Sequence, residues 1–315
     1  MKNIGITMIG HKGSGKTCYL YAMYSQMAFG VNGFTFMPDD FDKALQLENG
    51  WSTIVDEHKW PEGTNESNDF VFNCSYALRQ LIDFTWHDYR GGILKEGSQS
   101  SDYPKFREKL SNSGTLIICI SAEIVKGLLK NDHGAESFVR IYNQLLQQYV
   151  KDHARTVPIA ITITKSDLLE DEDFPKAIVI LKRLLGFLFE KNGNWMVMVV
   201  AVSLGENLTT EKDKPITGTI SPAHIHLPVM FAIYSTFNQL LFEKEIQSKK
   251  IEDKYRIESN KSPLQKFWNG ADTVSILNQL ETNKADLEAI KTDLNRIVNE
   301  LRKDTCVLFF NGEKL

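Results

Sequence analysis

Cysteine is scarce in this sequence, and neither sign of charge is in large excess. The four cysteines, Cys18, Cys74, Cys119 and Cys306, are scattered over 315 residues without C-x-x-C or paired Cys/His spacing. This excludes the pattern of a disulfide framework or a zinc site and favours a reducing compartment. The formal net charge is −4 and the isoelectric point is near 6.0, so electrostatics gives no reason to expect binding to nucleic acid or to an anionic membrane.

Long hydrophobic runs and a leader segment are also missing. The longest apolar stretches, such as residues 195–202, are far shorter than the roughly 20 residues that span a bilayer. The chain leads from Met1 directly into an apolar stretch and a glycine loop, without the cationic segment and cleavage site of a secretory signal. We therefore expect a soluble, cytoplasmic protein with no membrane span.

The first two thirds of the chain alternate short β-branched runs with longer stretches of helical period. The expected strands are residues 4–9, 70–77, 80–86, 115–120, 158–163 and 195–202. The expected helices are residues 16–29, 103–110, 135–151 and 175–190, with another that begins near Ala223. This alternation predicts an α/β protein with a mostly parallel sheet between two helical layers.

Past about Lys244 the composition shifts to charged and amide residues, so we divide the chain into residues 1–245 and a helical extension of residues 246–315. A long helix is expected from near Asp272. Its apolar residues Ile276, Leu280, Leu287, Ile290, Leu294, Ile297 and Leu301 follow coiled-coil spacing, with Asn283 at a core position. A coiled coil and an amphipathic helix packed on the α/β domain are both open. Residues 306–312 predict a short terminal hairpin.

A glycine-rich segment follows the first expected strand and leads into the first expected helix. Gly10, His11, Lys12, Gly13, Ser14, Gly15, Lys16 and Thr17 match G-x-x-x-x-G-K-[ST], the Walker A or P-loop pattern, and Cys18 follows. Glycines let backbone amides turn toward a polyphosphate, while the helix directs its positive end at the same charge. We expect Lys16 to reach the β and γ phosphates and the Thr17 hydroxyl to bind Mg²⁺.

Two further segments suit a metal ion beside the phosphates. Asp88-Tyr89-Arg90-Gly91 is a D-x-x-G sequence at a strand end. There Asp88 is expected to hold Mg²⁺ through water, and the Gly91 amide to meet the γ-phosphate. Asp83 competes with Asp88 but lies inside the strand. Thr64, after Trp60-Pro61-Glu62-Gly63, is the expected threonine ligand of the metal. Thr35 and Thr53 are its rivals.

Two segments match [NT]-K-x-D, a pattern whose aspartate accepts hydrogen bonds from guanine. Asn283-Lys284-Ala285-Asp286 lies in a polar helix, so we interpret it as helix surface. Thr164-Lys165-Ser166-Asp167 follows a buried strand, at the edge where ligands of parallel sheets bind. Asp167 is therefore expected to bind the base and Lys165 to lie over it. Ser203-Leu204-Gly205, after the next strand, is expected to offer a backbone amide to guanine O6.

In this order the motifs of residues 1–245 resemble the Ras-like, translation-factor-related class of P-loop GTPases. The segments 60–64 and 88–92 are more similar to bacterial members that are often encoded in multi-gene defence or conflict systems. The resemblance implies binding of GTP, GDP and Mg²⁺, hydrolysis of GTP to GDP, and a nucleotide-dependent switch. It also implies a protein effector or assembly partner at the switch segments and the C-terminal helix, while a homo-oligomer stays open.

One residue departs from the pattern of this class. Where Ras-like enzymes have a glutamine that orients the attacking water, this sequence has Gly92. We expect slow hydrolysis unless Arg90, His87 or a partner supplies the missing group, with Lys16, Thr64, Arg90 and Gly91 as the catalytic candidates. Two alternatives stay open: a scaffold that binds nucleotide without hydrolysing it, and an ATPase, which the segment 164–167 disfavours.

Overall fold

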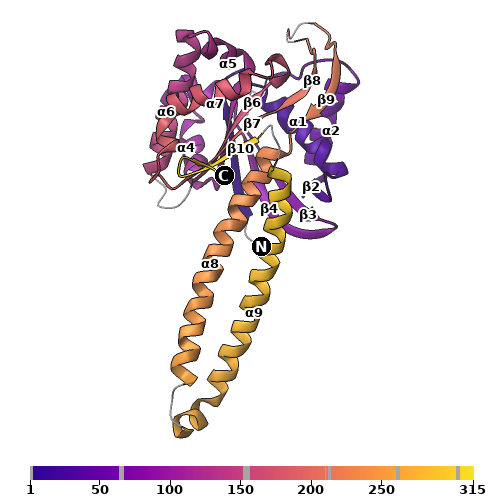
Figure 1. Ribbon diagram of the computed structural model, residues 1–315. Helices are drawn as coiled ribbons and strands as arrows, with labels where there is room; N and C mark the ends of the chain where they lie inside the picture. Colours follow the sequence, from indigo (N-terminus) through magenta and orange to yellow (C-terminus); the bar gives the residue numbers. More distant parts are fainter. Residues whose placement is uncertain are drawn as a thin grey trace. The chain divides into compact units, whose positions relative to one another are not determined.

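The computed structural model describes residues 3–63, 67–151, 157–209, 211, 214–259, 263–302 and 306–315. It divides into two compact units, Met1–Ala232 with Lys303–Leu315, and Ile233–Arg302. The larger unit is an α/β structure around a nine-stranded sheet, and the smaller one is a pair of long helices (Figure 1). The division predicted between residues 245 and 246 falls inside helix α8 (Leu227–Ser259).

The centre of the nine-stranded sheet is parallel, as the alternation of strands and helices predicted. The strand order is β11-β10-β7-β6-β5-β1-β4-β3-β2. The parallel strands are β1 (Asn3–Gly10), β4 (Arg79–Asp88), β5 (Thr115–Ser121), β6 (Val157–Thr164) and β7 (Trp195–Ala201). Because the strands run in the same direction, the ends of β1, β4 and β6 lie at one edge of the sheet, where motifs that follow them can meet.

Antiparallel strands complete both sides of the sheet. On one side lie β3 (Asn68–Tyr76) and β2 (Phe34–Pro38), and on the other β10 (Cys306–Phe310) and β11 (Glu313–Lys314). The predicted terminal hairpin is thus present, and β10 also pairs with β7 from Cys306↔Val200 to Phe310↔Met196. A separate two-stranded sheet contains β8 (Ser203–Glu206) and β9 (Thr219–Ala223).

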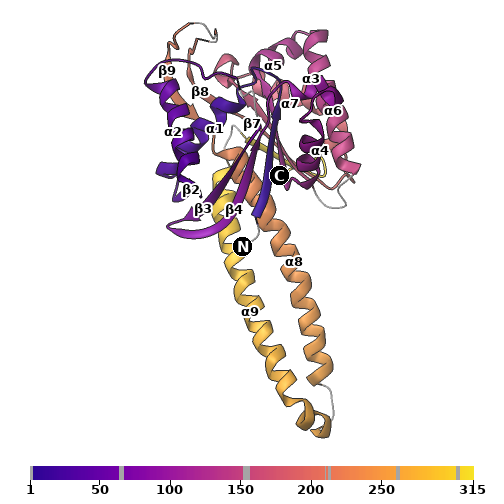
Figure 2. The ribbon, with the colours of Figure 1, turned by 180° about the vertical axis from the view of Figure 1, so that it is seen from behind.

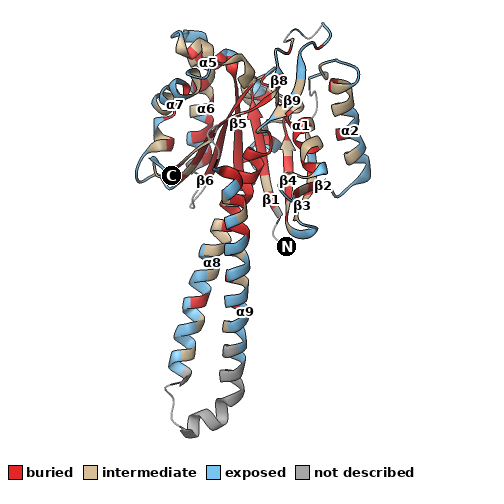
Figure 3. Cartoon of the chain, turned by 45° about the vertical axis from the view of Figure 1, so that its right-hand side comes forward, coloured by how far each residue is buried: buried red, intermediate tan, exposed pale blue. Residues whose placement is uncertain are grey.

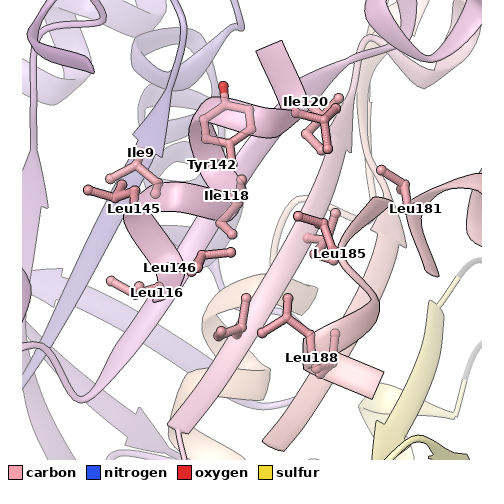
Figure 4. Packing of buried hydrophobic residues seen from close by; sticks show 14 of the residues in the cluster. Ile9, Leu116, Ile118, Ile120, Tyr142, Leu145, Leu146, Leu181, Leu185 and Leu188 are labelled. Atoms are coloured by element: carbon pink, nitrogen blue, oxygen red, sulfur yellow. The ribbon is translucent and has the colours of Figure 1, made fainter. Parts of the chain in front are cut away.

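One face of the sheet is covered by α4 (Tyr103–Asn112), α5 (Ala122–Leu129), α6 (His133–Lys151) and α7 (Asp173–Leu184), and short α3 (Ile93–Glu96) lies near them (Figure 2). Strand β5 is buried along its whole length, as a central parallel strand requires. Figure 4 shows how its Ile118 and Ile120 pack among side chains of α6 and α7, including Leu146 and Leu181. This apolar layer fixes the strand ends that carry the polar motifs.

Helices α1 (Lys16–Phe29) and α2 (Phe41–Val55) pack together at the other face. On α1, Tyr19 stacks on Trp86 of β4 with ring centroids 5.8 Å apart. Asp40 begins α2 by accepting a hydrogen bond from the amide of Lys43 at 2.9 Å, which satisfies an otherwise free amide of the first turn. Helix α1 is therefore fixed directly behind the glycine loop.

In the smaller unit, α8 (Leu227–Ser259) and α9 (Pro263–Leu301) lie side by side in both views of the ribbon. Asn283 is buried and donates from Nδ2 to the carbonyl of Lys244 at 3.3 Å, and Asp286 pairs with the Lys244 ammonium at 2.6 Å. The second N-K-x-D sequence thus makes contacts between two helices of one chain. The helix that pairs with the coiled-coil spacing of α9 is therefore α8 of the same chain.

The helix expected from residue 272 begins earlier, at Pro263. Proline suits the first helical position because its missing amide would have no partner there. Gly270 costs only about 1 kcal/mol inside a helix, so neither residue stops α9. Figure 3 shows α8 buried in its first turns and mostly exposed or partly exposed after them, in agreement with buried residues up to Phe237. No helix in the part of the chain that the structure describes combines the length and apolar character of a membrane span.

Candidate functional site

The glycine loop between β1 and α1 has the conformation that its sequence predicts. Gly13 and Gly15 both have φ of 84°, in the left-handed region that favours glycine. A Cβ on Gly10 would collide with the Ser14 hydroxyl and lie 3.0 Å from Cys119 Cβ. The Ser14 hydroxyl itself is buried and makes no hydrogen bond to any described residue. The loop is therefore tight, and it leaves one buried polar atom available to a ligand.

Lys16 points back across this loop and is nearly buried. Its ammonium donates to the carbonyl of Gly10 at 3.0 Å and to that of His11 at 3.5 Å. Burial lowers the pKa of Lys16, and the nearby carboxylate of Asp88 acts in the opposite direction. Asp88 is buried at the last position of β4, opposite Met8 of β1. A cation and a carboxylate therefore lie together beneath the loop.

A single pocket of about 740 Å³ extends from this loop to the T-K-x-D segment. Its lining includes Lys12 to Tyr19, Trp60 to Gly63, Arg90 to Gly92, Thr164, Lys165, Asp167 and Val202 to Leu204. Most of the residues singled out from sequence therefore lie around one cavity, Thr17, Cys18, Ser203 and Leu204 included. Thr64 lies outside the described residues, and Gly63 is the last described residue before it.

The T-K-x-D segment is bonded both to the glycine loop and to β8. Thr164, at the end of β6, donates from Oγ1 to the carbonyl of Ser14 at 2.7 Å. The Ser203 hydroxyl donates to Asp167 Oδ1 at 2.8 Å and accepts from the amide of Gly205 at 2.9 Å. Lys165 has a left-handed φ of 56° and pairs with Glu123 at 2.7 Å. These bonds hold the T-K-x-D segment against the glycine loop and fix the Asp167 carboxylate in the lining of the cavity.

The D-x-x-G segment contacts the loop through backbone. A Cβ on Gly91 would lie 2.7 Å from the backbone nitrogen and 2.8 Å from the Cα of Lys12, so only glycine permits this approach. The guanidinium of Arg90 donates from Nη1 to Glu96 Oε1 at 2.8 Å, from Nε to Asp102 at 3.3 Å and from Nη2 to the Ser100 hydroxyl at 2.6 Å. Arg90 is thus held by two carboxylates at the pocket wall.

Other candidates lie away from the described lining of the pocket. Thr53 is in α2 and donates to the carbonyl of Asn49 at 2.9 Å, while Thr35 is in β2 opposite Ser75. Asp83 accepts from Asn73 at 2.9 Å in the first half of β4. The His87 ring contacts Asp69 at 2.8 Å, and burial lowers its pKa. None of these side chains is positioned by a described contact toward the loop.

His11 stabilises the loop from outside the described pocket lining. Its ring lies 5.3 Å from that of Phe138 on α6, and its amide donates to the Tyr142 hydroxyl at 2.9 Å. Burial, then the positive charge of Lys16, lowers the pKa of His11 to about 4. A neutral ring at this position adds no positive charge beside the phosphate loop.

Sequence reasoning missed how the segment of Trp60 is held. The indole nitrogen of Trp60 donates to the carbonyl of Thr209 at 2.7 Å. The amide of Ile216 donates to the carbonyl of His58, also at 2.7 Å. Both partners lie about 150 residues further along the chain. Ile54, Leu208 and Ile216 form a small apolar cluster beneath this segment. No local pattern in the sequence signals such a contact.

Comparisons with known proteins add little to these observations. No protein-family model matches the sequence, and no curated protein matches it either. The fold is similar to a chain of the signal recognition particle receptor SRb-GTP/SRX complex from Chaetomium thermophilum, with 14% identity over 64% of this chain and 91% of that one, and a TM-score of 0.41. A second similar structure is the SsGBP and GDP complex, with 15% identity over 64% of this chain and 45% of that chain, and a TM-score of 0.32. Neither similarity assigns a function.

Proposed function

We propose that this chain is a guanine-nucleotide-binding protein of the P-loop class that hydrolyses GTP to GDP and acts as a switch. One observation carries the proposal: the glycine loop with Lys16 and the carboxylate of Asp167 line the same cavity. A nucleotide has a charged tail and a polar ring at its two ends, so a site for it needs both groups within reach of one molecule. The tail would lie in the amides of residues 10–17 and the base beside Asp167.

The chemistry of the donor set also suits Mg²⁺. Thr17 at the start of α1 and Asp88 at the end of β4 offer a hydroxyl and a carboxylate, the oxygen ligands that Mg²⁺ prefers. No group of three or more His, Cys, Asp or Glu side chains arranged to hold a metal occurs among the described residues. Such a partial set fits an ion that also needs phosphate oxygens and water. Bound there, Mg²⁺ would neutralise charge on the phosphates, and Thr64 is proposed as a further ligand.

Selection of guanine is assigned to Asp167. A carboxylate accepts hydrogen bonds from two neighbouring N–H groups, which guanine presents and adenine does not. The bond from Ser203 orients the Asp167 carboxylate, and Lys165 lies beside it in the lining. Asp167 is half-buried, and a bound base that covered its carboxylate without pairing it would be disfavoured. We infer a preference for GTP and GDP over ATP.

Hydrolysis is proposed to be slow in the isolated chain. Gly92 has no side chain to orient water, and Arg90 is engaged by Glu96 and Asp102. A partner that supplied an arginine would raise the rate by roughly 10³ to 10⁵. The same two observations favour the second candidate function, a scaffold that binds GTP without turnover. Single-turnover hydrolysis measured with and without partner extract separates the two.

The binding site is tested by competition between nucleotides. Fluorescent GDP is displaced by GTP or by ATP from the wild type, from Asp167→Ala and from Asp286→Ala. We expect wild type and Asp286→Ala to prefer GTP, because Asp286 belongs to the helical unit. Asp167→Ala should lose at least tenfold of that preference, since one charged hydrogen bond contributes about 1.5–3 kcal/mol. Equal affinity for GTP and ATP in wild type and Asp167→Ala would contradict the assignment.

A nucleotide-dependent switch also requires a partner protein that distinguishes its two states. We propose that a protein effector or assembly partner binds the segments 60–64 and 88–92 together with the helices α8 and α9. Such segments are ordered by γ-phosphate and Mg²⁺ and released on hydrolysis. The resemblance of these segments to bacterial conflict-system GTPases gives the proposed setting, in the cytoplasm.

A further inference from the structure

Lys12 lines the same cavity as Asp167 and lies against the D-x-x-G segment. It is the third residue of the glycine loop, its side chain is exposed, and it lines the cavity. The backbone of Gly91 lies against the Lys12 backbone, closely enough that no Cβ fits between them. With the base beside Asp167 and the γ-phosphate at the Gly91 amide, as the two motifs predict, Lys12 adjoins the γ-phosphate end of the nucleotide.

Four cationic side chains line the described part of the pocket, and three of them are engaged. Lys16 binds the carbonyls of Gly10 and His11. Arg90 binds Glu96, Ser100 and Asp102. Lys165 pairs with Glu123. Lys12 makes no ion pair or side-chain hydrogen bond with any residue that the structure describes, so its ammonium can bind a ligand without first losing a partner.

The adjoining glycines Gly91 and Gly92 line the pocket without side chains. Gly92 follows Gly91, and a Cβ on Gly92 would lie 2.7 Å from Glu96 Oε1, whose carboxylate is held by Arg90. A larger residue at position 92 therefore requires Glu96 to move. Glycine at position 92 adds no side chain to the lining of the pocket beside Gly91. The position that lacks a water-orienting glutamine thus follows directly after the residue whose backbone lies against Lys12.

We infer that Lys12 is the residue by which this site distinguishes a nucleoside triphosphate from a diphosphate. Its ammonium binds the terminal phosphate oxygens of GTP, which GDP does not have. A charged hydrogen bond to phosphate depends on the length of the phosphate chain and not on the base. The inference rests on the proposed nucleotide-binding function and adds specificity to the same site.

The experiment measures dissociation constants for GDP and for a non-hydrolysable GTP analogue in the presence of Mg²⁺. The proteins are wild type, Lys12→Ala, Lys12→Arg and, as a control with the same change of charge, Lys105→Ala on exposed α4. We expect Lys12→Ala to lose about tenfold in affinity for the GTP analogue and less than twofold for GDP. Lys12→Arg should recover most of the loss, and Lys105→Ala should match the wild type. The loss should also shrink as salt is raised.

The other outcomes overturn either the inference about Lys12 or the proposed function. Equal affinities of Lys12→Ala and wild type for the GTP analogue would remove the inference and leave the proposed function intact. An equal loss for GDP and the analogue would also remove it, because Lys12 would then serve the loop and not the terminal phosphate. Failure of the wild type to bind either nucleotide would overturn the proposed function itself. Circular dichroism spectra of all variants verify that each is folded.

Discussion

At the scale of single residues, the pocket depends on hydrogen bonds between loops that are far apart in the sequence. Thr164 binds the carbonyl of Ser14, and Ser203 binds Asp167. Each such bond contributes about 1 kcal/mol to stability, a modest amount. Their larger effect is positional, because they fix the glycine loop and the Asp167 carboxylate relative to each other before a ligand arrives.

His11 should make the stability of the nucleotide-free protein fall in acid. Its pKa is about 4 in the fold, against an ordinary value of 6.5, mainly because of burial. The unfolded chain therefore takes up a proton before the folded one. The contribution of His11 to the free energy of unfolding is complete above pH 6.5 and is lost as the pH falls from 6.5 toward 4. Since the ring is only partly buried, we expect a loss of roughly 1 kcal/mol between pH 7 and pH 5.

Urea unfolding at pH 7 and pH 5 measures this effect. His11→Asn should show a difference between the two pH values that is smaller by that amount. His133→Asn, at the exposed start of α6, should retain the pH dependence of the wild type. If His11→Asn and wild type lose the same stability in acid, His11 is not the group that takes up the proton.

At the scale of elements, Trp60 joins the segment before Thr64 to the loop after β8. We expect Trp60→Phe to remove the bond to Thr209 while keeping an aromatic ring in the apolar cluster. The loss of about 1 kcal/mol should raise amide hydrogen exchange around residues 58–63 by roughly fivefold. Amides of α6 give an internal control and should not change. Unaltered exchange in this segment would show that the indole bond does not hold it.

The local sequence pattern predicted helices and strands, because their apolar residues recur at a fixed period. It missed the contacts between segments that are far apart in the chain. The buried strand before Thr164 and the loop from Gly10 to Thr17 were predictable, because apolar runs and glycines have strong local preferences. Residues 306–310 predicted a hairpin strand, but their pairing with β7 joins segments about 110 residues apart. The bonds of Ser203 to Asp167 and of Trp60 to Thr209 also join segments that are not neighbours in the sequence. The start of α9 was missed because Pro263 reads as a break and yet suits a first helical position.

At the scale of the whole molecule, we expect Asn283 to restrict how the helices of the helical unit pair. Its side chain is buried against α8 and makes one hydrogen bond, to the Lys244 carbonyl. We expect Asn283→Leu to raise the stability of the α8 and α9 pair by about 1 kcal/mol, since an apolar side chain fills the position without a polar group to satisfy. The variant should also form oligomers, because a buried asparagine restricts which helices can pair.

Thermal unfolding followed by circular dichroism, with light scattering after gel filtration, measures both effects. Asn278→Leu, on the exposed side of α9, is the control for added hydrophobicity. If Asn283→Leu is less stable than wild type and has the same mass in solution, Asn283 does not restrict which helices pair.

The pairing of β10 with β7 makes the two long helices an insertion in the chain and not a tail. The α/β unit is completed only after Arg302, when the last residues return to its sheet. A truncation after residue 245, designed to isolate the domain that carries the glycine loop, would therefore remove two strands as well as the helices. It would expose the backbone of β7 as an open edge, which invites pairing with other chains. A minimal domain that keeps this edge paired must retain β10 and β11, with a linker in place of residues 233–302.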